Sequence, residues 1–224
     1  AYAAGALCIA LAAAILVWLW RRRRDRRASG APGRILERQA HDAPHKDGAA
    51  RRQEYDVNKK HMLAAIGTLK GSKLGQLGSD AALYKLPWYL VIGNPAAGKS
   101  TAIANSGLQF PYSENTIIEG VSGTRHCDWF LATDGILLDT AGRYSVAAED
   151  RAEWFDFLGL LKKYRKKAPI NGIVIAVSVA ELNGSGPEFA VELAKDLRMR
   201  VQEITERLEV HAPVYLLFTK ADLV

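Results

Sequence analysis

The hydrophobic pattern divides the chain into an uncharged apolar start, a polar stretch, and a long body in which apolar runs alternate with amphipathic segments. Residues 1–20 carry no charge, and about 20 apolar residues are enough for a helix to cross a bilayer. Trp18 and Trp20 end this run, where aromatic residues favour the membrane interface. The arginines of residues 21–27 follow at once, whereas a cleaved signal peptide carries its basic residues before the apolar run. We therefore predict a transmembrane helix over residues 1–20, with residues 21–224 in the cytoplasm.

The polar stretch after this helix predicts a linker followed by a helix. Residues 21–48 are basic, small and turn-rich, and we assign them as a juxtamembrane linker. Residues 49–84 are predicted to be a helical connector, because apolar residues up to about residue 68 fall on or near one helical face. These residues are Tyr55, Met62, Ala65 and Ile66. Because the chain begins with Ala rather than Met, we also expect it to be a fragment of a longer protein.

The body, residues 85–224, has the pattern of an α/β domain. Short apolar runs with the length of buried strands occur at 86–92, 127–132, 136–139, 173–179 and 214–218. Segments with helical spacing occur at 99–106, 150–167 and 188–208. Asp134-Gly135 separates the second and third apolar runs, and this dipeptide favours a β-hairpin. We therefore predict a mostly parallel sheet with one antiparallel hairpin.

The first apolar run leads directly into the sequence GNPAAGKS, which matches the P-loop pattern G-x-x-x-x-G-K-[ST] between a strand and a helix. In this motif the loop wraps phosphate oxygens with its backbone N–H groups. Lys99 is expected to reach the β- and γ-phosphates, and Ser100 to hold Mg²⁺ through its hydroxyl. The predicted nucleotide-binding residues of this loop are Gly93, Asn94, Pro95, Ala96, Ala97, Gly98, Lys99, Ser100 and Thr101.

A second motif, D-T-A-G, ends the run at residues 136–139. Asp139 is expected to hold Mg²⁺ through water, and the backbone N–H of Gly142 to sense a γ-phosphate. A threonine in the preceding loop is expected to complete the metal site. Thr124 is preferred over Thr116, because Thr124 lies just before the hairpin strand.

Arg143 follows D-T-A-G, at the position where small GTPases carry a water-orienting Gln. Arginine stays protonated and is therefore no general base. It either stabilises phosphoryl charge, which makes it a candidate catalytic residue beside Lys99, or makes a structural contact. No other residue is an obvious water-orienting group, so we expect slow intrinsic hydrolysis or dependence on a partner.

The sequence T-K-A-D at residues 219–222 resembles the guanine-reading element [NT]-K-x-D. Asp222 would accept the ring N–H and the exocyclic amine of guanine, while the stem of Lys220 would cover the base. Adenine presents an acceptor where guanine presents a donor, so Asp222 would face adenine unpaired. Thr219 replaces the usual Asn and loses the amide that ties this loop to the P-loop. Guanine is favoured, and the predicted ligand is GTP or ATP with Mg²⁺.

The net positive charge is concentrated in the N-terminal part of the chain, residues 1–60. The chain has 30 Lys+Arg and 24 Asp+Glu, a net charge of +6. Residues 1–60 hold 13 of the basic and 6 of the acidic residues, so residues 61–224 are close to neutral. Nucleic-acid binding needs clustered cations, and we therefore expect no nucleic-acid partner. The basic run at residues 162–167 is expected to be a solvated helix end, with contact to anionic lipid as the alternative. Cys8 and Cys127 show no disulfide or metal spacing.

The order of these elements resembles a Ras-like G domain, here truncated at its C-terminus. Individual segments are similar to those of the IcmF/TssM family of type VI secretion inner-membrane proteins, which has relatives in some type IV systems. The similarity covers about residues 60–224 and rests on the segments LPWYLVIGNPAAGKST, SGLQFPYS, GTRHCDWF, GILLDTAGRY, WFDFL, KKYRKKAPINGIVIAVSV and PVYLLFTKADL.

This resemblance implies a location and partners that the residue pattern alone does not give. It implies a cytoplasmic NTPase-like domain between transmembrane segments of the bacterial inner membrane. It further implies a membrane complex with TssL and the lipoprotein TssJ, contacts with baseplate proteins, and an oligomeric assembly. The function expected by resemblance is to support assembly or energising of the secretion apparatus.

Two other functions remain open at this point. In one, the domain binds nucleotide as a structural scaffold without meaningful hydrolysis, so its enzymatic activity is undecided. In the other, the chain is a GTPase like the signal-recognition-particle receptor, which also combines D-T-A-G-R with T-K-x-D. That class lacks the antiparallel hairpin before D-T-A-G and carries a D-T-x-R element that is missing here, so it is disfavoured.

Overall fold

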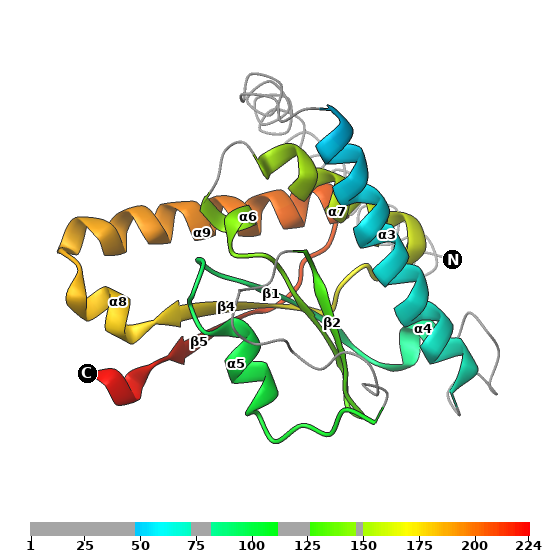
Figure 1. The fold of residues 1–224 in the computed structure, drawn as a ribbon, viewed down its shortest axis with the longest axis horizontal. Coiled ribbons are helices and arrows are strands. Elements are labelled where there is room, and N and C mark those ends of the chain that lie inside the picture. Colours follow the sequence, from blue (N-terminus) through cyan, green and yellow to red (C-terminus); the bar gives the residue numbers. More distant parts are fainter. Residues whose placement is uncertain (1–47, 73–81, 112–125, 147–149) are drawn as a thin grey trace, which may run out of the picture. The chain divides into compact units, whose positions relative to one another are not determined.

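The computed structural model describes residues 48–72, 82–111, 126–146 and 150–224, all within one unit of the chain, Ala43–Val224 (Figure 1). The predicted transmembrane helix and the linker up to residue 47 lie outside the described residues. In the part that the structure describes, no helix is both long enough and apolar enough to cross a membrane.

Five strands form one sheet in the order β2-β3-β1-β4-β5. β2 is antiparallel to β3, whereas β1 pairs in parallel with β3 and β4, and β4 pairs in parallel with β5. This arrangement confirms the predicted α/β fold with a mostly parallel sheet and one antiparallel pair. The strands are β1 (Trp88–Ile92), β2 (Asp128–Leu131), β3 (Ile136–Asp139), β4 (Gly172–Ser178) and β5 (Val214–Thr219).

The longer helices lie where the helical patterns predict them, and the shortest elements are additional. The longer helices are α3 (Gly48–Gly71), α7 (Arg151–Tyr164) and α9 (Pro187–Leu208), and the six-residue α5 (Lys99–Ala104) follows the GKS sequence. The additional elements are α4 (Ala82–Lys85), α6 (Arg143–Val146), α8 (Val179–Gly184) and the 3-10 turn η3 (Ala221–Leu223). One or two turns of helix are too short to leave a periodic pattern in the sequence.

Helices cover both faces of the sheet. α3, α7 and α9 cover one face over the larger core, and α5 lies against the other face (Figure 1). Trp88 and Trp154 are fully buried in the larger core, and Trp88 meets Trp129 edge-on with 5.3 Å between ring centroids. The smaller core under α5 contains Val91, Ile103 and Phe130. Coverage on both faces explains why the strands are continuous apolar runs rather than alternating ones.

Helix α3 buries a stripe that is polar in its first half and apolar in its second. Met62 and Leu69 are fully buried, and Met62 belongs to the predicted apolar face. Glu54 and Asn58 lie two turns and one turn before Met62 on the same stripe and are only 7% and 2% exposed. Buried polar side chains require hydrogen-bond partners. These two find theirs in segments that flank the candidate site.

The basic run at the end of α7 differs from the solvated helix end that the sequence predicts. Arg165 is 1% exposed and donates to the backbone carbonyls of Leu83, Leu86 and Ala168. Its guanidinium also lies 4.7 Å from the ring centroid of Trp88. Burial lowers the pKa of Arg165 to about 10. The expectation is therefore wrong for Arg165, which fastens the end of α7 to the start of the sheet.

Candidate functional site

The two sequence motifs meet at the carboxyl ends of neighbouring parallel strands. Residues 93–98, the glycine loop, follow β1, and residues 139–142, the DTAG segment, lie at the end of β3. Val91 of β1 is in register with Asp139 of β3, so both segments leave the sheet at the same edge. Ligands of open α/β sheets bind at this edge. The positions of the two segments are thus consistent with the prediction that both serve one site.

Gly93 begins the glycine loop in a conformation and a space that only glycine accepts. Its φ is 151°, and a Cβ atom there would lie 2.4 Å from the carbonyl oxygen of Ala176 in β4. The Ser145 hydroxyl lies 3.2 Å from the Gly93 backbone nitrogen and donates to its carbonyl oxygen at 3.1 Å. Gly98 ends the loop in the left-handed region, and Ala96 also has a positive φ. The positive φ angles at Gly93, Ala96 and Gly98 give the loop its tight backbone curvature.

Lys99 holds its ammonium group against the glycine loop. The side chain is 6% exposed, and Nζ donates to the carbonyl oxygens of Gly93 at 3.0 Å and Asn94 at 3.1 Å. Burial lowers the pKa of Lys99, although the charges of Asp139 and Glu181 act in the opposite direction. A cation held in this way can exchange backbone carbonyls for an anionic ligand placed in the loop.

Ser100 and Asp139, two of the three predicted metal-site residues, are in direct contact. The Ser100 hydroxyl donates to Asp139 Oδ2 at 2.5 Å, and Asp139 is fully buried. The Thr140 hydroxyl donates to the carbonyl of Val91 at 2.7 Å and fixes the start of the DTAG segment to β1. Thr124 and the alternative Thr116 lie outside the described residues. No cluster of three or more His, Cys, Asp or Glu residues that could hold a metal occurs among the described residues.

Gly142 brings the DTAG segment into backbone contact with the glycine loop. A Cβ atom on Gly142 would lie 2.4 Å from the backbone nitrogen and 2.5 Å from the Cα of Pro95. Only glycine permits two backbones to approach this closely. The predicted γ-phosphate sensor is therefore next to the predicted phosphate loop.

Thr219 connects the T-K-A-D segment to the glycine loop, contrary to the sequence-based expectation. Its hydroxyl donates to the carbonyl oxygen of Ala97 at 2.6 Å. The expectation that replacing Asn by Thr loses this connection is wrong, because a hydroxyl on a buried strand end reaches the same loop. Lys220 follows in the left-handed region, and Asp222 is exposed within η3.

The remaining predicted loop residues vary in exposure. Ala97 is buried, Asn94 is half-buried, and Pro95 and Ala96 are exposed at the crest of the glycine loop. Thr101 is exposed in the first turn of α5. The outer side of the loop is thus open to solvent while its base is packed on the sheet.

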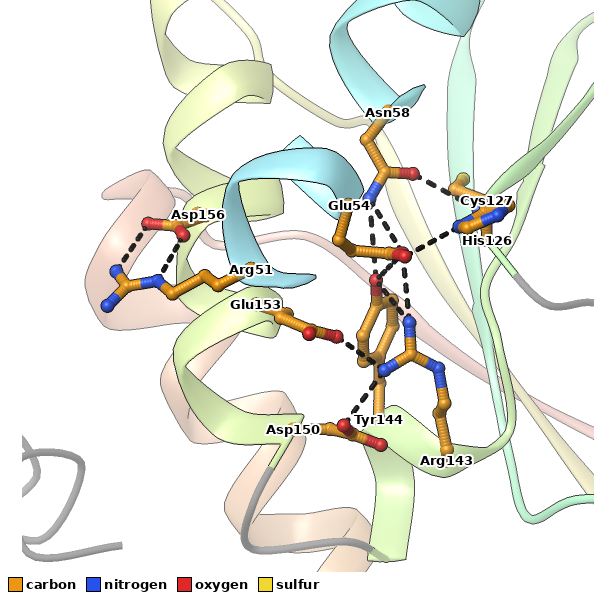
Figure 2. Close-up of polar contacts among 10 residues, drawn as sticks. All are labelled: Arg51, Glu54, Asn58, His126, Cys127, Arg143, Tyr144, Asp150, Glu153 and Asp156. Atoms are coloured by element: carbon orange, nitrogen blue, oxygen red, sulfur yellow. Dashed lines mark hydrogen bonds and ion pairs between the residues drawn. The ribbon is translucent and has the colours of Figure 1, made fainter. Parts of the chain in front are cut away.

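Arg143 lies in a cluster of carboxylates contributed by α3, by α7 and by the residue before α7 (Figure 2). Its guanidinium contacts Glu54 at 2.9 Å, Asp150 at 2.9 Å and Glu153 at 2.5 Å. Burial alone would lower the pKa of Arg143, but the hydrogen bond to Glu153 and the neighbouring carboxylate charges raise it overall. Arg143 therefore makes the structural contact that was one of its two predicted roles, and its catalytic role stays a prediction.

Four polar residues around the candidate site were not predicted from the sequence. The Ser145 hydroxyl donates to the Gly93 carbonyl of the glycine loop, and the Tyr144 hydroxyl donates to Glu54 at 2.7 Å. Asn58 accepts a hydrogen bond from the Cys127 backbone N–H. A signal was available for Glu54 and Asn58, since both continue the stripe of Met62 along α3. The positions of Tyr144 and Ser145 gave no signal, because α6 is a single turn.

Comparison with known proteins connects this chain to one family. The family described as IcmF-related N-terminal domain matches residues 147–224. The chain is also 45% identical over 191 residues to the type VI secretion system component TssM1 of Pseudomonas aeruginosa. That alignment covers 81% of this chain but only 17% of the relative, so the chain spans about a sixth of the length of the curated relative that it matches. On this identity and the matching family domain, the chain belongs to the IcmF/TssM family.

Proposed function

We propose that residues 85–224 bind a nucleoside triphosphate with Mg²⁺ and belong to the cytoplasmic part of a type VI secretion membrane-complex subunit. The observation that carries the nucleotide proposal is the convergence of Lys99, Ser100 and Asp139 at one edge of the sheet. A buried ammonium, a hydroxyl and a carboxylate meet there beside a glycine loop. This combination is the donor set that P-loop nucleotide sites use.

The residues at the site fit a hydrated Mg²⁺ ion. Mg²⁺ prefers oxygen ligands and usually keeps several waters, so one hydroxyl and one nearby carboxylate form a suitable pair. Ser100 and Asp139 supply these oxygens, and Thr124 is proposed as the further ligand. When bound, Mg²⁺ neutralises charge on the phosphate oxygens. Lys99 would hold the phosphates from the loop side, and the Gly142 N–H would contact them from the DTAG side.

Slow hydrolysis is the proposed chemistry, with non-hydrolysing binding as the second candidate. Arg143 would have to leave three buried carboxylates before it could stabilise phosphoryl charge, and this separation is energetically unfavourable. The contacts of Arg143 therefore favour weak or partner-dependent turnover, or a purely structural use of nucleotide. GTP is preferred over ATP because Asp222 stands exposed beyond Thr219, where it is available to a guanine base.

The role in secretion rests on the family and on the TssM1 relative. We propose association with the bacterial inner membrane, with TssL, TssJ and baseplate proteins as partners in an oligomeric assembly. No nucleic-acid partner is proposed, since the body of the chain is close to neutral. Because the chain spans only a small part of its relative, these partners are proposals for the longer protein in which it would lie.

The proposed site is tested by titrating Mg²⁺–GTP and Mg²⁺–ATP analogues into the full chain in detergent. Lys99→Ala removes a charge-assisted contact of about 1.5–3 kcal/mol, which corresponds to about 10- to 150-fold weaker binding. Lys195→Ala is the matched control, because it removes an exposed lysine that pairs with Glu192 on α9. Equal affinities of wild type and Lys99→Ala would refute the site. Binding without phosphate release, even with secretion partners added, would favour the scaffold function over hydrolysis.

A further inference from the structure

The one-turn helix α6 contacts the glycine loop on one side. Ser145 lies within hydrogen-bond distance of both the N–H and the carbonyl of Gly93. Gly142, directly before α6, touches the backbone of Pro95 so closely that no side chain fits between them. A shift of the glycine loop would therefore displace the short segment from Gly142 to Ser145.

The same short segment contacts helix α3 on its other side (Figure 2). Arg143 Nη2 lies 2.9 Å from Glu54 Oε1, and the Tyr144 hydroxyl donates to the same oxygen at 2.7 Å. Asn58, one turn further along α3, donates to Glu54 at 3.2 Å. Consecutive residues of one turn thus hold the glycine loop and α3 together.

A second connection reaches Glu54 from the start of β2. His126 Nδ1 lies 2.6 Å from Glu54 Oε2, and the Cys127 backbone N–H donates to Asn58 at 3.3 Å. In the sequence these residues follow the predicted Mg²⁺-binding Thr124 by two and three positions. Glu54 therefore contacts both the residues after the DTAG segment and the start of β2, where Asp128 is in register with Asp139.

Burial makes this network sensitive to small movements. Glu54 is 7% exposed, and Tyr144 is 2% exposed. Electrostatic contacts strengthen and unpaired groups become costly where water is excluded. Burial by itself would raise the pKa of Glu54, but the hydrogen bonds from Tyr144 and His126 and the charge of Arg143 lower it overall. Two of the three groups that hold this carboxylate, Arg143 and Tyr144, directly follow the DTAG segment and would move with it.

The geometry points to Arg143 and Tyr144 as positioning residues that couple the phosphate-binding loop to Glu54 of α3. Nucleotide binding at the loop alters α3, which follows the arginine-rich segment in the sequence. This inference rests on the proposed nucleotide site. It also gives Arg143 a role in which its guanidinium stays among its carboxylates.

A neighbouring ion pair supplies a matched control for this coupling. Arg51 of α3 donates to Asp156 of α7 at 2.7 and 2.9 Å. It therefore joins α3 to α7, the helix that also contributes Glu153 to the contacts of Arg143. Neither residue has a described contact with the segment from Gly142 to Ser145. Asp156→Asn therefore weakens the docking of α3 without touching the connection through Arg143.

The coupling is tested by backbone hydrogen exchange of α3 in the full chain in detergent, with and without Mg²⁺–GTP or Mg²⁺–ATP. In wild type and in Asp156→Asn, nucleotide is expected to change exchange over residues 51–62 by about fivefold, the lower end of typical coupling. In Glu54→Gln this response falls below about twofold while saturable nucleotide binding remains. Tyr144→Phe removes only the hydroxyl contact and is expected to reduce the response partly, which provides a second variant if Glu54→Gln folds poorly.

Three results would overturn the inference. Nucleotide binding without any change in α3 of the wild type would overturn the coupling and leave the proposed site standing. An equal loss of response in Asp156→Asn and Glu54→Gln would show that only general docking of α3 matters. Absence of saturable binding of either nucleotide would overturn both the coupling and the proposed site.

Discussion

Two buried charge clusters lie under the same layer of helices, and their compositions are opposite. In the Arg143 cluster, one guanidinium is surrounded by the carboxylates of Glu54, Asp150 and Glu153. In the Glu203 cluster, one carboxylate contacts Arg151 at 2.5 Å and Arg200 at 2.6 Å and accepts the Trp154 indole N–H at 3.0 Å.

The two clusters differ in what they connect. The Glu203 cluster joins α7 to α9, and the contacts described for it include neither the glycine loop nor the DTAG segment. The Arg143 cluster begins at the residue after the DTAG segment and reaches α3. Both are expected to stabilise the fold, but only the Arg143 cluster is expected to respond to a ligand at the glycine loop. The two clusters are therefore distinguished by measuring both the free energy of unfolding and the nucleotide affinity of each variant.

The largest stability effect is expected from Glu203→Ala. The change leaves two buried arginines and an indole N–H without their partner, and breaking a buried ion pair costs about 3–5 kcal/mol. The free energy of unfolding from denaturant titration measures this loss. Glu192→Ala on the same helix breaks only an exposed pair and is expected to cost about 0–1 kcal/mol. Nucleotide affinity should stay at the wild-type value in both variants, and a large drop in Glu203→Ala at temperatures where it is folded would remove the distinction between the clusters.

Arg143→Lys is expected to have a smaller effect on stability and a measurable effect on binding. Lysine keeps the charge but lacks the planar fork that reaches three carboxylates, so a stability loss of about 1–3 kcal/mol is expected. Nucleotide affinity is expected to change by about fivefold through the coupling to α3. A loss of stability with unchanged affinity for both Mg²⁺–GTP and Mg²⁺–ATP would make this cluster as purely structural as the Glu203 cluster.

The smallest expected effect is a pH dependence of stability that arises from Glu54. Its pKa is lower in the folded chain than its ordinary value near 4.5. Such a carboxyl contributes stability above its unfolded pKa and loses that contribution as the pH falls through the folded pKa. Denaturant titrations from pH 6 downwards should therefore show a steeper fall in wild type than in Glu54→Gln. Parallel curves would indicate that Glu54 is held no more strongly than a neutral amide.

Local patterns predicted the strands and the longer helices, because each of these depends on residues that are close together in the sequence. Local motifs also assigned Ser100 and Asp139 to one proposed metal site, although their direct contact was not predicted. The connections between elements were not predictable in this way. Tyr144 and Glu54 are 90 positions apart, and Thr219 and Ala97 are 122 apart. Arg165 illustrates the same limit, since its basic neighbours suggest a solvated end while distant carbonyls of α4 and its surroundings bury it.

The most direct test of the central claim is the Mg²⁺ dependence of nucleotide affinity, measured by equilibrium titration of GTP and ATP into the full chain with Mg²⁺ or with chelator. If Ser100 and Asp139 hold the metal beside the loop of Lys99, Mg²⁺ should strengthen binding in wild type. In Asp139→Asn this strengthening should be largely lost, because the carboxylate that faces the metal becomes a neutral amide. Affinities that are the same with and without Mg²⁺, or no saturable binding under either condition, would contradict the account.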